Sequence, residues 1–234
     1  MGETILRAVD IKRVFKTAGG DFMALKGVNV DVEAAKLTIL KGRSGSGKTT
    51  LMNIMGQLDN PTSGQILFNG EDLTKRPSGG KDAFRRTNAG FVFQSVALVG
   101  MMSAFENVEF GLRIAGYDRK ESALRAKRCL DLVGLGQRMQ HMARELSGGE
   151  QQRVAIARAI AHKPSIIFAD EPTAELDTST GFAVMRVFKD LIDSEGVTVL
   201  MTTHDPGLMD IADKLYVMED GIVTESQDTA GGKA

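Results

Sequence analysis

The 234-residue sequence contains a single cysteine, and no apolar run in it is long enough to cross a bilayer. One thiol cannot form an internal disulfide, which fits a reducing compartment, and we expect Cys129 to be a core residue of a helix. No stretch approaches about 18 apolar residues, and the N-terminus lacks the layout of a signal peptide. We therefore expect a soluble, cytoplasmic protein that reaches a membrane only through a partner.

A surplus of charge of one sign is also missing. The 29 Lys and Arg side chains and 30 Asp and Glu side chains give a formal net charge of −1 and a pI near 6.3. This balance creates no overall field that would attract nucleic acid or an acidic membrane surface. We expect no nucleic-acid partner and one α/β domain spanning residues 1–234, a length that suits a large core with a small subdomain.

The segment 42–50 matches the phosphate-binding loop pattern G-x-x-x-x-G-K-S/T at every required position. The apolar run Leu37–Leu40 before it predicts a buried strand, and Thr50–Met55 after it predicts a helix packed on that strand. Backbone N–H groups of such a turn and the helix N-terminus bind phosphate. A flexible, glycine-rich loop is the alternative, and the flanking strand and helix argue against it. The predicted binding residues are Gly42, Arg43, Ser44, Gly45, Ser46, Gly47, Lys48, Thr49 and Thr50.

Two residues of this loop have distinct expected tasks. Lys48 would reach the β- and γ-phosphates of ATP, and the Thr49 hydroxyl would ligate Mg²⁺. Farther along, Ser165–Glu171 predicts a buried strand that runs into two carboxylates. Asp170 fits the task of holding Mg²⁺, and Glu171 could polarise the water that attacks the γ-phosphate. Two solvated acids at a strand end are the alternative.

Two other predicted strands, Gly90–Gln94 and Thr198–Thr203, also end in polar residues. Ligands of an α/β sheet bind at the carboxyl ends of its strands. Gln94 could therefore ligate the metal or hold the attacking water, or it could be an ordinary strand-end glutamine. A lone histidine is usually structural, yet His204 follows the second strand at this same edge.

The rest of the chain divides into a β-rich front region and a helical insert. Strands at Ile5–Val9, Val28–Val32 and Ile66–Phe68 predict an antiparallel β layer beside the loop-bearing core. Helical periods at Phe105–Ile114 and Asp118–Leu132 predict an all-helical insert. We expect the core at about 1–95 and 154–225, the helical subdomain at about 96–153, and a flexible tail at 226–234.

The nearly uncharged run Val96–Met102 opens this insert. Such a run is usually buried, but Met-rich apolar surface also forms adaptable grooves that bind helices.

A second candidate anion site begins at Leu146. Ser147 and Glu150 have the spacing of a capping box, which is a purely structural explanation. Gly148 and Gly149 nevertheless weaken a helix start, and exposed N–H groups at a helix N-terminus bind anions. We expect one nucleotide per chain, and loop 42–50 already binds it. The ligand of this second anion site is therefore still to be explained.

The order of these parts resembles the nucleotide-binding subunit of ABC transporters, from about Ile5 to Glu225. The motif residues are Leu146-Ser147-Gly148-Gly149 followed by Gln151-Gln152-Arg153, and Ala169-Asp170-Glu171-Pro172-Thr173. Segments 24–28, 52–59 and 91–94 resemble the subgroup that serves lipoprotein-releasing, macrolide- or peptide-exporting and cell-division permeases.

The resemblance implies a P-loop NTPase core with an antiparallel β layer and an inserted helical subdomain. It implies that two subunits close head to tail around two ATP molecules, so that Ser147, Gly148, Gly149 and Glu150 of one chain complete the other chain's site. The residues alone leave open whether the signature helix folds back toward its own loop. By the same resemblance, Phe15 stacks on adenine, Gln94 senses Mg²⁺ and the permease, and His204 contacts the γ-phosphate. Phe15 by itself is more often a core residue.

Three positions depart from the family pattern: Phe15 replaces the more usual Tyr, Glu150 replaces Gln, and Glu175 replaces a small or neutral residue.

The resemblance implies an ATPase that drives a membrane permease, docked near Gln94 and Val96–Met102 on the cytoplasmic face of the membrane. The alternatives are an ATP-dependent regulatory subunit of a membrane complex and a soluble ABC ATPase. No basic stripe, zinc-bearing insert or second copy of the domain favours the soluble type.

Overall fold

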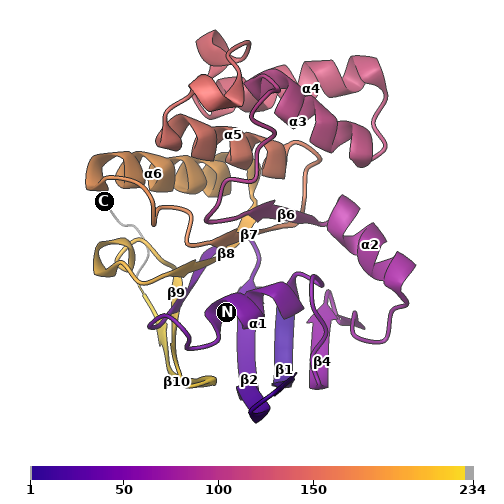
Figure 1. Cartoon of the computed structure of the whole chain (residues 1–234), viewed down its shortest axis with the longest axis vertical. Coiled ribbons are helices and arrows are strands. Elements are labelled where there is room, and N and C mark those ends of the chain that lie inside the picture. The colour runs from indigo at the N-terminus through magenta and orange to yellow at the C-terminus, as the bar shows by residue number, and fades with distance from the viewer. Residues whose placement is uncertain (1, 230–234) are drawn as a thin grey trace.

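The computed structural model describes residues 2–229, which form two β-sheets and two groups of helices (Figure 1). The larger sheet has six strands in the order β10-β9-β3-β8-β7-β6. Five of them are parallel, and β10 pairs antiparallel with β9 at the edge. Their bounds are β3 Leu37–Lys41, β6 Ala89–Val92, β7 Ile166–Asp170, β8 Thr198–Thr203, β9 Lys214–Glu219 and β10 Ile222–Asp228.

The smaller sheet is antiparallel, in the order β2-β1-β4-β5, and confirms the expected β layer of the front region. Its strands are β1 Thr4–Thr17, β2 Gly20–Glu33, β4 Ser63–Phe68 and β5 Glu71–Asp72. The pairing of β1 with β2 shifts register three times between Ala8 and Val14, and these irregularities twist the end of β1.

Side chains of the six-stranded sheet alternate between two hydrophobic cores. In β7, Ile167 and Ala169 face one core while Ile166 and Phe168 face the other. Helices α3–α6 cover the first face, and helix α1 with the antiparallel sheet covers the second (Figure 1). The helices are α1 Lys48–Met55, α2 Ser78–Thr87, α3 Ala104–Ile114, α4 Arg119–Leu132, α5 Gly148–Ile160 and α6 Thr178–Glu195, with short 3₁₀ turns at Gly136–Arg138, Ala143–Glu145 and Pro206–Leu208.

Several boundaries differ from the sequence expectations. Helix α2 has no counterpart among the predicted elements. Only Phe84 of its side chains is buried, so the segment lacks the periodic apolar pattern that predicts a helix. Strand β6 ends at Val92, which leaves Gln94 beyond the strand.

The expectation of a flexible tail from Ser226 is wrong for its first residues. Ser226, Gln227 and Asp228 continue β10 and pair with β9. Residues 230–234 lie outside the described part of the chain. Cys129 is 7% exposed on α4, as expected for a core residue. Within residues 2–229, no helix combines the length and apolarity that spanning a membrane requires.

Candidate active site

The loop between β3 and α1 depends on close contacts of its glycines. Gly47 has φ 102°, a conformation that side chains rarely adopt, and a Cβ there would lie 2.9 Å from a Leu25 methyl of β2. A Cβ at Gly42 would collide with the carbonyl oxygen of Met218 in β9. The loop is therefore pressed between the two sheets, and its position is set by strands distant in sequence.

Lys48 opens α1 and lies almost completely buried, at 4% exposure. Its ammonium donates hydrogen bonds to the carbonyl oxygens of Gly42, at 2.8 Å, and Arg43, at 3.1 Å. The Glu171 Oε1 atom lies 3.5 Å from the same nitrogen. A buried cation needs such partners because removal from water is costly.

The end of β7 meets this loop through Asp170. Its Oδ1 atom accepts hydrogen bonds from the Thr49 hydroxyl, at 3.1 Å, and from the Thr202 hydroxyl of β8, at 2.5 Å. The Glu171 backbone N–H donates to the Thr202 hydroxyl at 2.9 Å. Glu171 has φ 43°, so the chain turns sharply directly after the strand. Thr202 thus orients both acidic residues.

The end of β8 brings a histidine to the same place. The His204 Nδ1 atom lies 2.9 Å from Oε2 of Glu171, and the His204 side chain is 63% exposed. Glu171 therefore bridges the buried ammonium of Lys48 and the exposed imidazole of His204. A pocket of about 610 Å³ adjoins them, lined by residues 41–46, His204 and residues 217–220.

Thr202 is the functional residue that the sequence analysis missed. It is completely buried in β8, and its hydroxyl contacts both Asp170 and Glu171. Burying a hydroxyl without a hydrogen-bond partner is costly. The two threonines at the end of this predicted strand, Thr202 and Thr203, were therefore the sequence signal for a polar contact there.

The oxygen donors at this edge fit a magnesium ion. The Thr49 hydroxyl and the Asp170 carboxylate are adjacent, and both are hard ligands of the kind that Mg²⁺ takes together with waters and phosphate oxygens. No group of three or more His, Cys, Asp or Glu side chains within residues 2–229 could hold a metal by itself. Gln94 is exposed. Within residues 2–229, its side chain makes no hydrogen bond to Thr49 or to Asp170.

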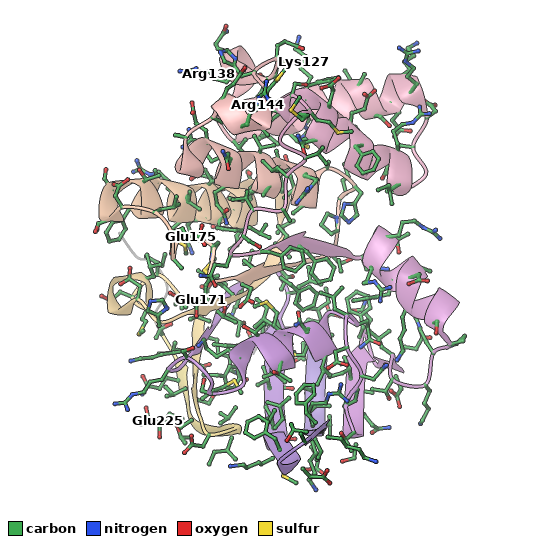
Figure 2. The ribbon with its side chains drawn as sticks, viewed as in Figure 1. Lys127, Arg138, Arg144, Glu171, Glu175 and Glu225 are labelled. Carbon is green, nitrogen blue, oxygen red and sulfur yellow. The ribbon has the colours of Figure 1, made fainter. Side chains whose placement is uncertain are left out.

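The signature segment lies elsewhere. Helix α5 packs in the core on the opposite face of the six-stranded sheet from α1. Within residues 2–229, no hydrogen bond or ion pair joins residues 146–150 to the loop 42–50. Figure 2 shows Arg138, the ion-pair partner of Glu150, at the far end of the helical layer, away from Glu171. The structure therefore separates the two candidate anion sites of one chain.

The start of α5 is a capping box, as its spacing predicted. Ser147 Oγ accepts from the Glu150 N–H, and Glu150 Oε2 accepts from the Ser147 N–H at 2.9 Å. That backbone hydrogen bond lowers the pKa of the Glu150 carboxyl. A Cβ at Gly149 would collide with the Thr180 side chain of α6, so only glycine fits there. Ser147 itself is exposed and available to a ligand.

Phe15 lies on β1, far along the sequence from the catalytic edge. It is half-buried, and it stands two residues after Arg13, whose strand partner Leu25 touches the loop at Gly47. Phe15 pairs with Phe22 of β2 and belongs to neither hydrophobic core.

The sequence model of the ABC transporter family matches residues 25–174. The lipoprotein-releasing system ATP-binding protein LolD 2 of Caulobacter vibrioides is 39% identical over 94% of this chain and 97% of its own length. The macrolide export ATP-binding/permease protein MacB of Syntrophobacter fumaroxidans is 41% identical over 97% of this chain, which spans 32% of that longer protein.

Among solved structures, the dimeric post-hydrolysis state of the ATP-binding cassette MJ0796 bound to ADP and Pi superposes with a TM-score of 0.88. It is 35% identical, over 97% of this chain and 100% of that one. The expected fold and the resemblance to the LolD and MacB subgroup are therefore confirmed. This chain belongs to the ABC transporter family and is an ATP-hydrolysing cassette of that family.

Proposed function

We propose that two copies of this chain close head to tail around two ATP molecules and drive a membrane permease. The separation of the loop 42–50 from the signature residues 147–150 carries this proposal. Helices α1 and α5 pack on opposite faces of the six-stranded sheet, and within residues 2–229 no hydrogen bond or ion pair joins residues 146–150 to the loop 42–50. A second copy, turned around, supplies the missing anion site.

The residues at the sheet edge divide the reaction among them. The N–H groups of the loop and Lys48 bind the β- and γ-phosphates, and Thr49 and Asp170 hold Mg²⁺, which would neutralise phosphate charge there. Glu171 accepts the proton of the attacking water, and His204 contacts the γ-phosphate. Gln94 joins the site only by moving toward it, because its side chain is exposed beyond β6.

Glu171 gives this site a switch. Its carboxylate is paired with Lys48 and with His204. An incoming γ-phosphate needs the same two partners, so it competes with Glu171 for both. The displaced carboxylate then remains beside the phosphate and is available to orient a water molecule. Binding and activation of the base are therefore one event.

The permease docks at the entrance of the helical subdomain. The expected docking region included the run Val96–Met102, but Leu98 of that run packs against the hydrophobic core. Met101 is 65% exposed, and α3, which follows directly, exposes Phe110 and Ile114 on one helical face. We propose that Met101, Phe110 and Ile114 contact a short apolar helix of the permease.

This docking segment is also attached to the signature. The Arg144 guanidinium donates to the Met101 sulfur, and the Ala143 N–H donates to the Met102 carbonyl at 2.9 Å. Arg144 is followed two residues later by Leu146 and the capped start of α5. A movement of Met101 would therefore displace the signature as well as Gln94.

The relatives bear on substrate and location. Because relatives are named for lipoprotein release and macrolide export, we propose export or extraction of a lipid-linked, peptide or drug-like substrate. The subunit would sit on the cytoplasmic face of the membrane through its permease. An ATP-dependent regulator of a membrane complex is the second candidate function.

The test combines isolation and turnover. The full chain is purified in mild detergent with the membrane protein that accompanies it, and ATP hydrolysis is measured in vesicles. Hydrolysis stimulated by a transported substrate supports the pump, whereas hydrolysis that responds only to assembly supports the regulator. Recovery of the chain without any membrane protein would contradict both. Lys48→Ala, which removes the buried cation from the loop, is the nucleotide-binding control.

A further inference from the structure

The aromatic ring of Phe15 has a planar cation over one of its faces. The Arg13 Cζ atom lies 4.5 Å from the centre of the ring. The pairing of β1 with β2 shifts register between Arg13 and Val14, and the contact itself shows that the two side chains lie on the same side of the strand. The guanidinium therefore covers one face of the Phe15 ring.

Arg13 is anchored from the other side by an acidic residue. Its Nη2 atom lies 2.9 Å from Oδ1 of Asp59, and the two side chains are only 23% and 30% exposed. Arg13 Nε is buried with no hydrogen-bond partner in the described chain, so the guanidinium is held by Asp59 and the ring. Asp59 follows the C-terminal end of α1, the helix that Lys48 begins.

The backbone of β1 is tied to the same connection. The Val14 N–H donates to the Thr62 hydroxyl at 2.9 Å, and the Thr62 N–H donates to the Lys12 carbonyl at 2.8 Å. Residues 59–62 therefore fix the position of the Phe15 strand relative to α1. The base end and the phosphate end of the site are linked by one short segment.

We propose that Arg13 is a positioning residue for the nucleotide base. Its guanidinium, held by Asp59, packs on the rear face of Phe15 and fixes the ring at the distance that a base and a bound triphosphate require. This rests on the proposed stacking of adenine on Phe15. A planar guanidinium suits the task because it stacks on an aromatic face while its edge bonds a carboxylate. A ring fixed in advance also loses less freedom when the base binds.

The test compares two ligands of the full chain in the presence of Mg²⁺: ATP and inorganic tripolyphosphate, which has no base. Arg13→Met should weaken ATP binding about fivefold, the scale of one cation–π contact, and leave tripolyphosphate binding unchanged. The KM for ATP should rise with kcat unchanged. The matched control is Arg7→Met, which breaks a different Arg–Asp pair, Arg7 Nε of β1 to Asp31 Oδ1 of β2 at 2.6 Å. Within residues 2–229, Arg7 makes no cation–π contact. It should bind both ligands like the parent.

Two further variants test that Arg13 acts through the ring. Arg13→Lys keeps the charge but not the planar group, so it should lose ATP affinity nearly as Arg13→Met does. Combining Arg13→Met with Phe15→Leu should weaken ATP binding no more than Phe15→Leu alone.

Three outcomes would overturn the inference. Equal losses for ATP and tripolyphosphate would mean a general structural role, and no loss would mean no role. Tighter ATP binding by Arg13→Met would mean that the guanidinium occupies the face that the base needs. If Phe15→Leu itself leaves ATP affinity unchanged, the proposed stacking on Phe15 fails; if only Arg13→Met is without effect, the inference about Arg13 fails alone.

Discussion

The Lys48 ammonium lies 3.5 Å from Oε1 of Glu171, so the phosphate-binding cation and the expected catalytic base are held together by their opposite charges. The pair joins the start of α1 to the end of β7, two elements separated by more than a hundred residues. Since His204 holds the other oxygen of Glu171, the carboxylate is restrained at both ends. In the proposed mechanism, the γ-phosphate of ATP takes over these contacts from Glu171.

Replacing Glu171 with Gln should separate binding from hydrolysis. We expect ATP binding to persist, because the loop and Lys48 are intact, and hydrolysis to slow by roughly 10²–10⁴, the range for loss of a general base. Dimers formed with ATP should then last long enough to be seen by size-exclusion chromatography. Hydrolysis at the parent rate would show that another group is the base.

Ser147→Arg should disable a site in trans. The substitution places a bulky cation where the partner's γ-phosphate must approach the N-terminus of α5, and the N-cap at Ser147 is lost as well. Equal amounts of Ser147→Arg and Lys48→Ala chains are mixed under conditions in which subunits exchange. One site of each mixed dimer carries both lesions and the other is intact, so single-turnover hydrolysis should recover.

The matched control for that mixture is each variant alone, because both sites of either homodimer are damaged. Circular dichroism of Ser147→Arg checks that the altered helix start leaves α5 folded. Recovery in the mixture supports sharing of residues between copies. Full activity of the Ser147→Arg homodimer would contradict any role of the signature in the site.

Replacing Met101 and Phe110 together with Asp should weaken assembly with the permease. Both side chains are largely exposed, so the isolated subunit should stay folded and bind ATP like the parent. Co-purification with the membrane partner is the measurement. Leu124→Asp on α4, a residue with 72% exposure outside the proposed surface, is the control. Normal assembly of the double variant would place the docking surface elsewhere.

His162 predicts a dependence of stability on pH. Burial lowers the pKa of this imidazole below its usual value of 6.5, although its hydrogen bond with the Ala89 carbonyl opposes the shift. Below pH 6.5 the unfolded chain therefore binds a proton that the folded chain does not, so stability falls as pH falls. The loss has a limiting slope of about 1.4 kcal/mol per pH unit.

His162→Gln removes the titrating group and keeps a side chain able to donate to Ala89. Its free energy of unfolding, measured with urea between pH 5 and 8, should fall less steeply on acidification than that of the parent. Parallel pH profiles would show that His162 does not titrate differently in the two states.

The chemistry of the phosphate loop could be predicted from the sequence because it is local. Segment 42–50 carries its own backbone N–H groups, Lys48 and the helix start, and the apolar strand before it identifies its context. Asp170 and Glu171 were predictable for the same reason, since a buried strand running into two acids needs no distant partner to be noticed. The capping box at Ser147 is likewise a relation between residues three apart.

Other features depended on contacts between distant segments. Thr202 became a site residue only where β8 lies beside β7, and Leu98 was excluded from the docking surface because the core covers it. Ser226 to Asp228 are polar and resemble a tail, yet backbone pairing with β9, which requires no apolar side chains, orders them.

The sequence by itself predicted which groups would bind phosphate, and the tertiary structure decided how these groups are distributed. Alternation along β7 shows that both faces of the sheet are buried, but it does not say which helix covers which face. The crossover connections place α1 on one face and α5 on the other. No local sequence pattern predicts which face each helix covers. That placement, with α1 and α5 packed against different faces of one sheet, is the basis for the proposal that the signature of each chain serves the nucleotide of a second copy.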